Sequence, residues 1–259
     1  MDRVGGRNTV LEALIAKRKI YKIFVASGID ENDVTRRIFS LAREQKVPVI
    51  RVDKKYLNTL TSTRHQGVVA LCAEHGYGYT DIEEILRKLK EGGKAPFLLI
   101  LDELEDPHNL GAILRSADGA GVDGIIIPKR HSAGLTPVVA KVSAGAIEYV
   151  QVARVVNIAT AIHRLKDDGI RIIGASEDAK NVYFEVDMRG AVALVIGGEG
   201  RGIRRLVKEK CDLLVRIPMR GHISCLNASV ATSLLIYEKL RQDIFQSIKS
   251  DERGGQRST

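Results

Sequence analysis

From Phe97 onward the chain repeats one pattern, in which a short, strongly apolar run is followed by a stretch with apolar residues at helical spacing. The apolar runs are FLLILDE, GIIIP, YVQVARV, RIIGA, AVALVIG and LLVRIP. Strands that are apolar along their whole length are buried on both faces, and strands that alternate with helices are typical of parallel sheets. The pattern predicts an α/β domain whose mostly parallel sheet is covered by helices on both faces.

The first third of the chain predicts a second, smaller α/β layer. Strand-like runs occur at residues 20–26, 47–52 and 67–73, and helical spacing occurs around residues 10–15 and over 32–46. A glycine-rich connector follows, and Thr80 with Glu83 forms a capping box for a short charged helix through Lys90.

The chain is therefore expected to have four parts. They are a small domain at 1–75, a linker with a short helix at 76–95, a larger domain at 96–245 and a polar tail at 246–259. The last helix is expected over residues 227–243, and the end of the tail is expected to fray.

Positive charge is concentrated in the smaller domain. The chain carries a net charge of +8, and residues 1–75 account for +6 of it. A basic domain joined to a nearly neutral one suggests that the first binds a polyanion while the second carries out chemistry. The sequence leaves open the alternative that Arg36, Arg37, Lys54 and Lys55 only form a solvated face.

Composition argues against several other classes. No apolar run approaches the roughly 20 residues that cross a bilayer, and residues 1–6 lack the apolar core of a secretory signal. We therefore expect a cytoplasmic protein with no membrane partner. The three cysteines form no CxxC pair and the six histidines are scattered, so we expect neither a disulfide framework nor a metal site.

Three stretches that combine glycine with polar residues follow apolar runs. They are DPHNLGAILRSADGAG at residues 106–121, IGGEGRGI at 196–203 and IPMRGHISCLNASVA at 217–231. Glycine and asparagine allow positive φ and a close approach of the backbone to a ligand. Because these stretches lie at strand ends of one sheet, we expect them to form one site.

None of these stretches is a phosphate-binding loop. Gly119, Gly121 and Gly124 have the G-x-G-x-x-G spacing, but they follow a helix and precede a strand, the reverse of the Rossmann order. In GGEGRGI the third glycine position holds Ile203, and no G-x-x-x-x-G-K-[ST] occurs. Oxidoreductases that use dinucleotides and nucleotide hydrolases are therefore disfavoured.

At these stretches the sequence resembles a known family. N-L-G-x-x-x-R with Asn109 and Arg115, GGEGRG with Glu199, and IPMxG followed by LNxSVA with Asn227 are similar, in order and spacing, to the three motifs of SpoU-class RNA 2′-O-methyltransferases of the SPOUT superfamily. GRNTVLEAL near the start and HQGVVA at 65–70 resemble the substrate-binding domain of bacterial enzymes that methylate a guanosine of large-subunit ribosomal RNA. The resemblance covers nearly the whole chain except the tail.

The resemblance implies a fold that the apolar pattern does not reveal. In this family the C-terminal segment of the sheet is threaded through a loop to make a deep trefoil knot, which is a rare arrangement. The N-terminal domain resembles ribosomal protein L30. The expected fold class is thus a SPOUT α/β trefoil-knot domain preceded by a small α/β L30e-like domain. Members bind S-adenosylmethionine in the knot and act as homodimers with each site near the subunit interface.

By position, the resemblance also implies which residues hold S-adenosylmethionine. Backbone groups at Gly197, Ile217 and Leu226 would contact it, with Gly198, Gly200 and Met219 close by. We expect a side chain at Gly197 or Gly198 to occupy space that the cofactor needs. The alternative is that each glycine only ends a helix or forms a turn.

Methyl transfer to a ribose hydroxyl requires in-line alignment and a way to accept or offset one proton. The resemblance makes Arg115 the leading catalytic residue. Because arginine is costly to deprotonate, we expect it to hold the phosphate beside the reacting ribose and to stabilise the developing alkoxide. Asn109 and Asn227 would be positioning groups, and Glu199 would orient an arginine.

Two positions have a second interpretation. Arg115 could instead form a surface ion pair with Asp118 or Glu105. Where relatives carry serine before Leu-Asn, this chain has Cys225, with Ser224 one residue earlier. A thiol is a weaker donor than a hydroxyl. Because the chemistry needs no covalent intermediate, we expect Cys225 to be a small buried residue and not a nucleophile.

The function that the resemblance implies is S-adenosylmethionine-dependent 2′-O-methylation of a guanosine ribose in 23S ribosomal RNA. The basic N-terminal domain and the HQG stretch favour ribosomal RNA over transfer RNA, which remains an alternative. A protein that binds RNA without catalysis is a second alternative. Candidates for RNA contact are Arg7, Asn8, Arg64 and His65, although Asn8 could instead cap a helix.

Overall fold

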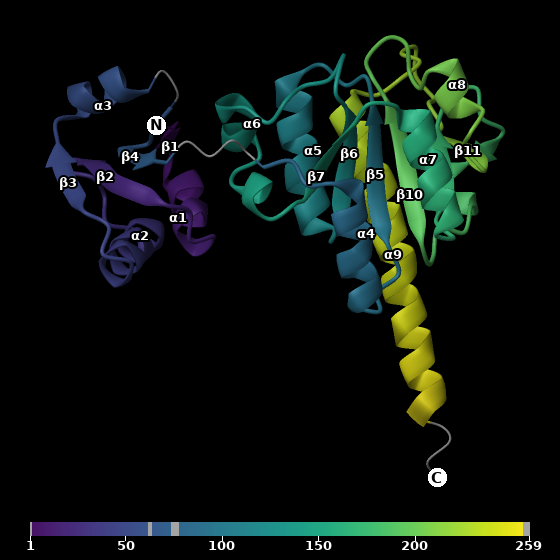
Figure 1. Cartoon of the computed structure of the whole chain (residues 1–259), viewed down its shortest axis with the longest axis horizontal. Helices are drawn as coiled ribbons and strands as arrows, with labels where there is room; N and C mark the ends of the chain where they lie inside the picture. Colours follow the sequence, from purple (N-terminus) through teal and green to yellow (C-terminus); the bar gives the residue numbers. More distant parts are fainter. Residues whose placement is uncertain (1, 62–63, 74–77, 256–259) are drawn as a thin grey trace. The chain divides into compact units, whose positions relative to one another are not determined.

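The computed structural model describes residues 2–61, 64–73 and 78–255 (Figure 1). The chain divides into two compact units, Met1–Gly78 with Gly134–Tyr149 and Tyr79–Ala133 with Val150–Thr259. The second unit begins inside the linker that the sequence suggests, and a segment from the middle of the chain belongs to the first. Each unit has its own sheet and is described by itself.

The smaller unit is built on a four-stranded sheet in the order β1-β4-β2-β3. Its strands are β1 (Asp2–Gly5), β2 (Ile20–Ala26), β3 (Val49–Val52) and β4 (Val68–Cys72). Its helices are α1 (Arg7–Ile15), α2 (Asp33–Glu44), α3 (Lys54–Leu60) and α6 (Pro137–Val142), with the short 3-10 helix η1 (Ala146–Glu148). β2 pairs in parallel with β3 and antiparallel with β4, so the sheet is mixed.

Most of the smaller unit follows the predicted pattern. The three predicted strands and the two predicted helices are confirmed, and Val10, Ile23 and Ile38 lie in one buried cluster between them. The sequence DRVG of β1 is too short to show an alternation. The alternative that Asn8 caps a helix is wrong, because Gly6 is the N-cap of α1 and Asn8 lies inside its first turn.

The larger unit contains a seven-stranded sheet in the order β7-β6-β5-β10-β8-β11-β9. Its strands are β5 (Phe97–Asp102), β6 (Gly124–Pro128), β7 (Val152–Val155), β8 (Arg171–Ala175), β9 (Asn181–Val182), β10 (Val192–Gly197) and β11 (Leu213–Arg216). Neighbouring strands are parallel throughout the part of the sheet that the structure describes. The six predicted strands and their parallel arrangement are confirmed, and only the two-residue β9 is additional.

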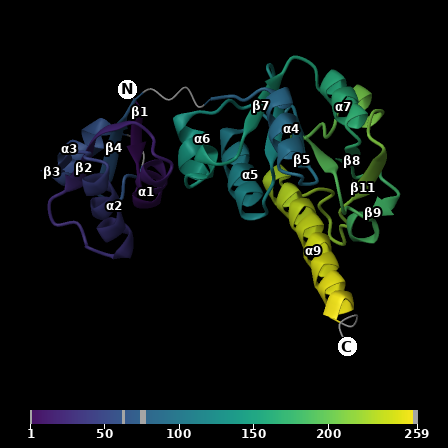
Figure 2. The ribbon, with the colours of Figure 1, turned by 60° about the horizontal axis from the view of Figure 1, so that its bottom comes forward.

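Helices cover both faces of this sheet (Figures 1 and 2). They are α4 (Ile82–Glu91), α5 (Pro107–Gly119), α7 (Ile158–Asp167), α8 (Arg205–Lys208) and α9 (Ala228–Gly255), with the 3-10 helix η2 (Tyr183–Glu185). α4 and α7 pack on one face, where Ile85 and Ile162 join Leu98, Ile172 and Val195 in a buried cluster. α5 and α9 lie side by side on the other face. Every residue of β5 and β10 is buried, as the apolar runs predicted.

The start of α4 differs from the prediction. Asp81 is its N-cap and Ile82 its first residue, so the capping box expected from Thr80 and Glu83 is wrong. Thr80 instead donates its backbone N–H to the carbonyl of Val152 over 2.9 Å and forms a parallel bridge beside β7. The residue that favours a helix start is here used to extend the edge of the sheet.

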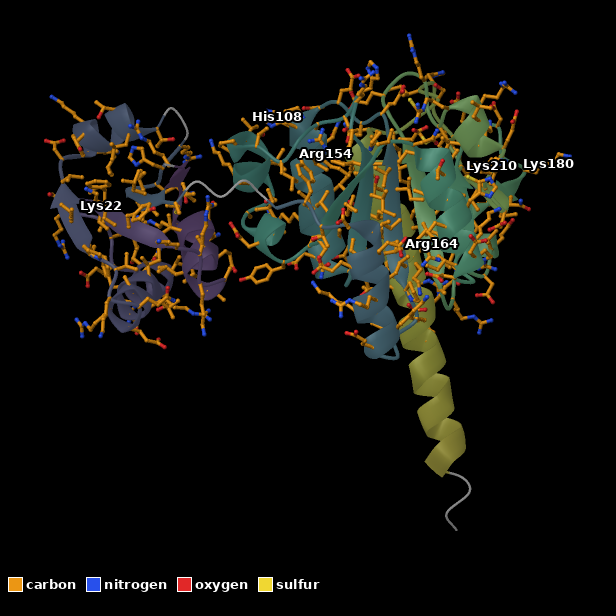
Figure 3. The ribbon with its side chains drawn as sticks, in the orientation of Figure 1. Lys22, His108, Arg154, Arg164, Lys180 and Lys210 are labelled. Atoms are coloured by element: carbon orange, nitrogen blue, oxygen red, sulfur yellow. The ribbon has the colours of Figure 1, made fainter. Side chains whose placement is uncertain are left out.

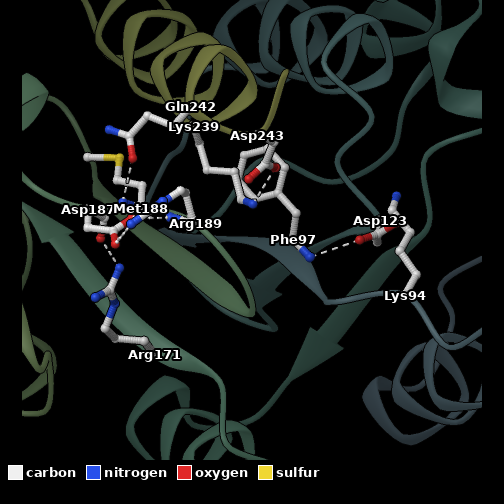
Figure 4. Close-up of polar contacts among 10 residues, drawn as sticks. All are labelled: Lys94, Phe97, Asp123, Arg171, Asp187, Met188, Arg189, Lys239, Gln242 and Asp243. Carbon is white, nitrogen blue, oxygen red and sulfur yellow. Dashed lines mark hydrogen bonds and ion pairs between the residues drawn. The ribbon is translucent and has the colours of Figure 1, made fainter. Parts of the chain in front are cut away.

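α9 is longer than predicted and is anchored at the amino edge of the sheet (Figure 4). It continues to Gly255 and does not end at residue 243, because no glycine or proline interrupts the sequence before Gly254. Gln242 donates its amide to the carbonyl of Val186 over 2.9 Å and accepts the N–H of Met188 over 2.8 Å. None of the helices in the described ranges combines the length and hydropathy that a membrane span requires.

A buried lysine adds to this anchor. Lys239 is 3% exposed, and its Nζ lies 2.5 Å from the carboxylate of Asp243 and 5.2 Å from the centre of the Phe97 ring (Figure 4). The N–H of Phe97 in turn donates to Asp123 over 2.8 Å. These contacts fix where α9 lies along β5, and therefore also where α9 begins at the opposite edge.

Candidate active site

The three glycine-bearing stretches all follow the carboxyl ends of strands in the larger unit. Residues 103–106 join β5 to α5, residues 198–204 join β10 to α8, and residues 217–227 join β11 to α9. β5 and β10 are neighbours, and the strands run in parallel, so these loops meet at one edge of the sheet. Ligand sites of open parallel sheets lie at this edge.

Three side chains, from the three stretches, are hydrogen-bonded to one another. Asn109, in the first turn of α5, donates its amide to the carboxylate of Glu199. Asn227 donates its amide to Oδ1 of Asn109 over 3.0 Å and to Oε1 of Glu199 over 3.3 Å. Asn109 is buried, whereas Glu199 and Asn227 are exposed. The polar cluster Asn109–Glu199–Asn227 therefore has a buried base and a rim that faces solvent.

Asn227 also starts α9. Its Oδ1 accepts the backbone N–H of Ser229 over 3.0 Å and of Val230 over 3.4 Å, as an N-cap does. The Ser229 hydroxyl donates to the same oxygen over 2.6 Å. Because one side chain both caps α9 and donates to Asn109 in α5, the first turns of the two helices are locked together.

Glu199 has partners other than the expected one. The expectation that it orients an arginine is wrong in this structure, because its hydrogen-bond donors among the described residues are the amides of Asn109 and Asn227. A carboxylate that accepts from two amides fixes which way each amide points. The role of Glu199 in the geometry is to orient the two asparagines.

An ion pair at the base of the site was missed by the sequence reasoning. Asp102, the last residue of β5, is fully buried, and its carboxylate accepts the backbone N–H of Arg204 over 2.9 Å. The Nε and Nη2 of Arg204 donate to it over 2.9 and 2.6 Å, and Nη1 lies 3.2 Å from Glu103. Hydrogen bonding to Asp102 raises the pKa of Arg204, so the guanidinium stays charged. The sequence contains one indication of this ion pair, which is an aspartate at the end of a wholly apolar strand. A carboxylate that is buried there requires a partner.

The glycines of the loop after β10 are required by the chain itself. A Cβ on Gly197 would overlap the backbone of Gly202, and a Cβ on Gly198 would overlap the carbonyl of Glu103. Side chains there would collide with protein backbone, and the expectation that they would also take space from a cofactor stays a prediction. Gly200 is different: a Cβ would have open space, but its φ of 82° lies in the left-handed region. The alternative that these glycines build turns accounts for the shape of this loop.

A hollow of about 580 Å³ lies beside the polar cluster. Residues of the two loops at 103–106 and 198–202 line it, including Glu199 and Arg201. Its size falls within the range of small-molecule sites, which is roughly 300–1,000 Å³. The hollow gives the polar cluster access to a ligand at the carboxyl edge of the sheet.

The other residues predicted near the cofactor belong to the segment after β11. Ile217 and Leu226 are half-buried, and Met219 is 36% exposed. Cys225 is exposed, so the expectation of a buried cysteine is wrong. Residues 221–225 are exposed throughout, because this segment crosses the surface without packing against a core.

Arg115 lies apart from the polar cluster. It is exposed on α5, six residues after Asn109, and at about 100° per residue the two side chains leave the helix in different directions. The alternative ion pair of Arg115 with Asp118 stays a prediction, whereas Glu105 lies 3.6 Å from His131.

The four residues predicted to contact RNA gather in the smaller unit. Arg7, Asn8, Arg64 and His65 all line one hollow of about 1,110 Å³. Asn8 and Arg64 are exposed, and Arg7 uses Nε to donate to the carbonyl of Gln66 over 3.1 Å. The structure thus brings these four side chains to one surface of this unit.

His65 is a structural member of that group. It is buried, its Nδ1 accepts the N–H of Gly67 over 3.0 Å, and its Nε2 lies 2.9 Å from Oδ1 of Asn58. This geometry fits the neutral ring that donates from Nε2. Burial, followed by the positive charge of Lys54, lowers the pKa of His65 below its ordinary value of 6.5. His65 therefore shapes the wall of the hollow in its uncharged form.

Within the described ranges no group of three or more metal-ligating side chains comes together.

Family comparison assigns both parts of the chain. Residues 96–237 match the SpoU rRNA Methylase family, and residues 3–78 match the family described as RNA 2′-O ribose methyltransferase substrate binding. The first match contains the polar cluster and the hollow beside it. The second contains the four residues predicted to contact RNA.

Named relatives and solved structures agree with this assignment. A TrmH family tRNA/rRNA methyltransferase of Bacillus subtilis is 45% identical over 93% of this chain and 96% of its own length. One of Staphylococcus aureus is 47% identical over 92% of this chain and 95% of its own. The crystal structure of an RNA 2′-O ribose methyltransferase superposes with a TM-score of 0.75 at 25% identity, covering 93% of this chain and 88% of that one. The SpoU methyltransferase AviRb of Streptomyces viridochromogenes, in complex with AdoMet, shares the fold with a TM-score of 0.72 at 23% identity over 93% and 90% of the chains. The chain therefore belongs to the SpoU family of RNA 2′-O ribose methyltransferases.

Proposed function

We propose that this protein methylates the 2′-hydroxyl of a guanosine in 23S ribosomal RNA with S-adenosylmethionine as the methyl donor. The observation that carries the proposal is the polar cluster Asn109–Glu199–Asn227, which joins the three motif-bearing stretches at one edge of the sheet. A site that must hold a donor and a ribose in line needs such fixed geometry.

The segment after β11 and the loop after β10 fit S-adenosylmethionine. Ile217 and Leu226 offer half-buried apolar surface for a ring system, and the open side of Gly200 leaves main-chain groups accessible. We propose that the donor binds at these residues, with Gly197, Gly198 and Met219 beside them. We also propose that the chain is knotted in this part of the fold. The bound donor would supply an electrophilic methyl group on a sulfonium. AviRb, which has the same fold, was crystallised with AdoMet.

The remaining roles fall to side chains of this chain. Asn109 and Asn227, held by Glu199, would position the reacting ribose beside the hollow. Arg115 would hold the adjacent phosphate and stabilise the developing alkoxide, since a guanidinium is permanently charged and presents a planar pair of donors. This role requires an exposed arginine, and Arg115 is exposed on α5.

Ribosomal RNA is favoured as the substrate by the smaller unit. Residues 1–75 carry +6 of the net charge, and Arg7 and Arg64 line a hollow wide enough for RNA groups. Transfer RNA is the second candidate, because the relatives are named as tRNA/rRNA methyltransferases. Either substrate would place the protein in the cytoplasm.

We also propose that the protein acts as a homodimer. Val230, Leu234, Tyr237 and Ile244 follow helical spacing along one side of α9, and each is at least 39% exposed. An apolar stripe of this kind is typical of a surface that pairs with another chain. A second copy is the natural partner because α9 begins at the site, and pairing there would bring two sites close together.

The test uses labelled S-adenosylmethionine with two unmodified transcripts, 23S ribosomal RNA and a transfer RNA pool. We expect label in 23S RNA at one guanosine, mapped by resistance of the neighbouring linkage to alkali. Label in transfer RNA alone would support the second candidate. No label in either RNA, with the protein folded, would overturn the proposed activity.

A further inference from the structure

The cations of the larger unit are distributed unevenly over the two edges of its sheet. At the amino edge most are neutralised, as in the pairs Lys90–Asp168, Lys94–Asp123, Lys166–Asp212, Arg189–Asp187 and Lys239–Asp243. At the carboxyl edge, Lys129 and Arg130 after β6 and Arg201 after β10 are exposed and have no acidic partner within the described part of the chain. Charge without a partner therefore collects on the edge that carries the site.

Lys129 and Arg130 belong to a loop with a fixed shape. The N–H of Lys129 donates to the carbonyl of Val155 over 2.8 Å, and Nη2 of Arg154 donates to the carbonyl of Lys129 over 2.8 Å. Arg154 itself lies over the ring of Tyr79 at 4.7 Å from its centre. Figure 3 shows Arg154 and His108 near the end of the sheet where β5 and β6 finish. A loop held in this way presents its two cations at little cost in conformational entropy.

The same loop is attached to the wall of the hollow. The N–H of Ala133 donates to the carbonyl of Leu104 over 2.7 Å, and His131 lies 3.6 Å from Glu105. Leu104 and Glu105 line the hollow on one side, and Arg201 lines it as well. The cations of the 129–131 loop and Arg201 thus belong to the same rim.

Three of the four carboxylates that line the hollow have donors of their own, and the fourth, Glu105, lies beside His131. Glu103 pairs with Arg204, Asp106 accepts the N–H of His108 over 2.9 Å, and Glu199 accepts from two amides. These carboxylates make no ion pair with Lys129, Arg130 or Arg201 within the described part of the chain, so the three cations remain available to an incoming anion.

We propose that Lys129 and Arg130, together with Arg201, bind RNA phosphates next to the nucleotide that enters the hollow. The inference rests on the proposed function for the identity of the polyanion, and it adds a phosphate-binding rim in the larger unit to the RNA contacts expected in the smaller one. Lysine and arginine bind phosphates without reading the base sequence. We therefore expect this rim to determine the affinity for RNA and the register in which the RNA binds, and not the identity of the methylated base.

The test is RNA binding by the full-length double variant Lys129→Gln, Arg130→Gln, with unmodified 23S transcript as the probe. The matched control is Arg87→Gln, Lys88→Gln, which removes the same charge from exposed positions on α4. Loss of two phosphate contacts should weaken binding about tenfold and make the plot of log K against log salt shallower by about 1.5. The control should stay within twofold of the wild type.

Binding of S-adenosylmethionine, measured by calorimetry, separates this inference from a folding defect. We expect the double variant to bind it as the wild type does, and Lys129→Arg, Arg130→Lys to restore RNA affinity. The inference is overturned if the glutamine variant binds RNA like the control or loses cofactor affinity in parallel. If the wild type transfers no methyl group to RNA, the proposed activity fails, while the salt dependence still tests the rim.

Discussion

Asn227 donates its side-chain amide to the side-chain oxygen of Asn109, 118 residues earlier in the chain, over 3.0 Å. With Glu199 accepting from both, the contact joins the ends of β5, β10 and β11 through polar side chains. Hydrophobic packing brings the strands together, and the hydrogen bonds of this cluster then fix the positions of the three loops relative to one another.

The two functions of Asn227 can be separated by substitution. Asn227→Ala removes both the helix cap and the bridging amide, so it should cost about 1 kcal/mol of stability. Asn227→Ser keeps an oxygen that can cap α9, and its unfolding free energy should stay within a few tenths of a kcal/mol of the wild type. Because both lack the amide, both should lose about a hundredfold in methyl transfer. Wild-type turnover by Asn227→Ser in a labelled-methyl assay would remove the bridge from the account.

We expect Arg204 to stabilise the folded protein through its pair with Asp102 at the base of the site. Arg204→Ala leaves the buried carboxylate of Asp102 with the backbone N–H alone, and we expect a loss of about 2 kcal/mol, less than for a fully buried pair because the guanidinium is partly exposed. The neighbour Arg205 pairs with Glu209 at the surface, so Arg205→Ala should change stability by less than about 0.5 kcal/mol. Denaturant unfolding of both variants measures the difference, and equal values would contradict a structural role for the Asp102 pair.

His65 should make the smaller unit sensitive to acid. Its folded pKa is lowered by burial and by Lys54, so between that pKa and its ordinary value of 6.5 the unfolded ring binds a proton that the folded ring does not. The stabilisation is thus complete above about pH 6.5 and declines as the pH falls below it. The imidazole resonances should titrate with a midpoint below 6.5, and exchange of the Gly67 N–H, corrected for its intrinsic rate, should quicken at pH 5.5. A midpoint at or above 6.5 would contradict the assignment, and His65→Gln is the control that cannot titrate.

Arg115 is expected to act on the reaction and not on the cofactor. Arg115→Ala should reduce methyl transfer by more than about a hundredfold, as loss of a group that stabilises an oxyanion does, while affinity for S-adenosylmethionine stays within a few-fold. Arg115→Lys keeps the charge but not the planar pair of donors, so it should recover only part of the rate. Near-normal turnover by Arg115→Ala would remove this residue from the mechanism.

The sequence predicts the elements of this fold well where burial dictates residue type. The apolar runs of β5 and β10 are buried along their whole length, and a continuous apolar run of this length is typical of a strand that is covered on both faces. β1 and β9 escaped prediction because four and two residues are too few to show a period. The start of α4 was wrong because Thr80 has two local options, a capping box and a strand bridge, and tertiary pairing decides between them.

The site was predictable in its parts but not in its contacts. Strand order places the loops on one edge. The three-dimensional structure is needed to show that Glu199 accepts hydrogen bonds from two asparagines and that Arg204 pairs with Asp102. Side-chain partners depend on loop conformation, and the loop after β10 is shaped by collisions that Gly197 and Gly198 avoid. Those collisions are between residues that lie close together in space, and the spacing of residues along the sequence does not predict such contacts.

The most direct test is a crystal structure of the protein grown with saturating S-adenosylmethionine. The donor should lie against main-chain groups of Gly197, Ile217 and Leu226, with its methyl group directed toward the hollow lined by Glu199. A loop segment that fills this space, or a donor bound at another surface, would contradict the proposal that the three stretches form the methyl-transfer site.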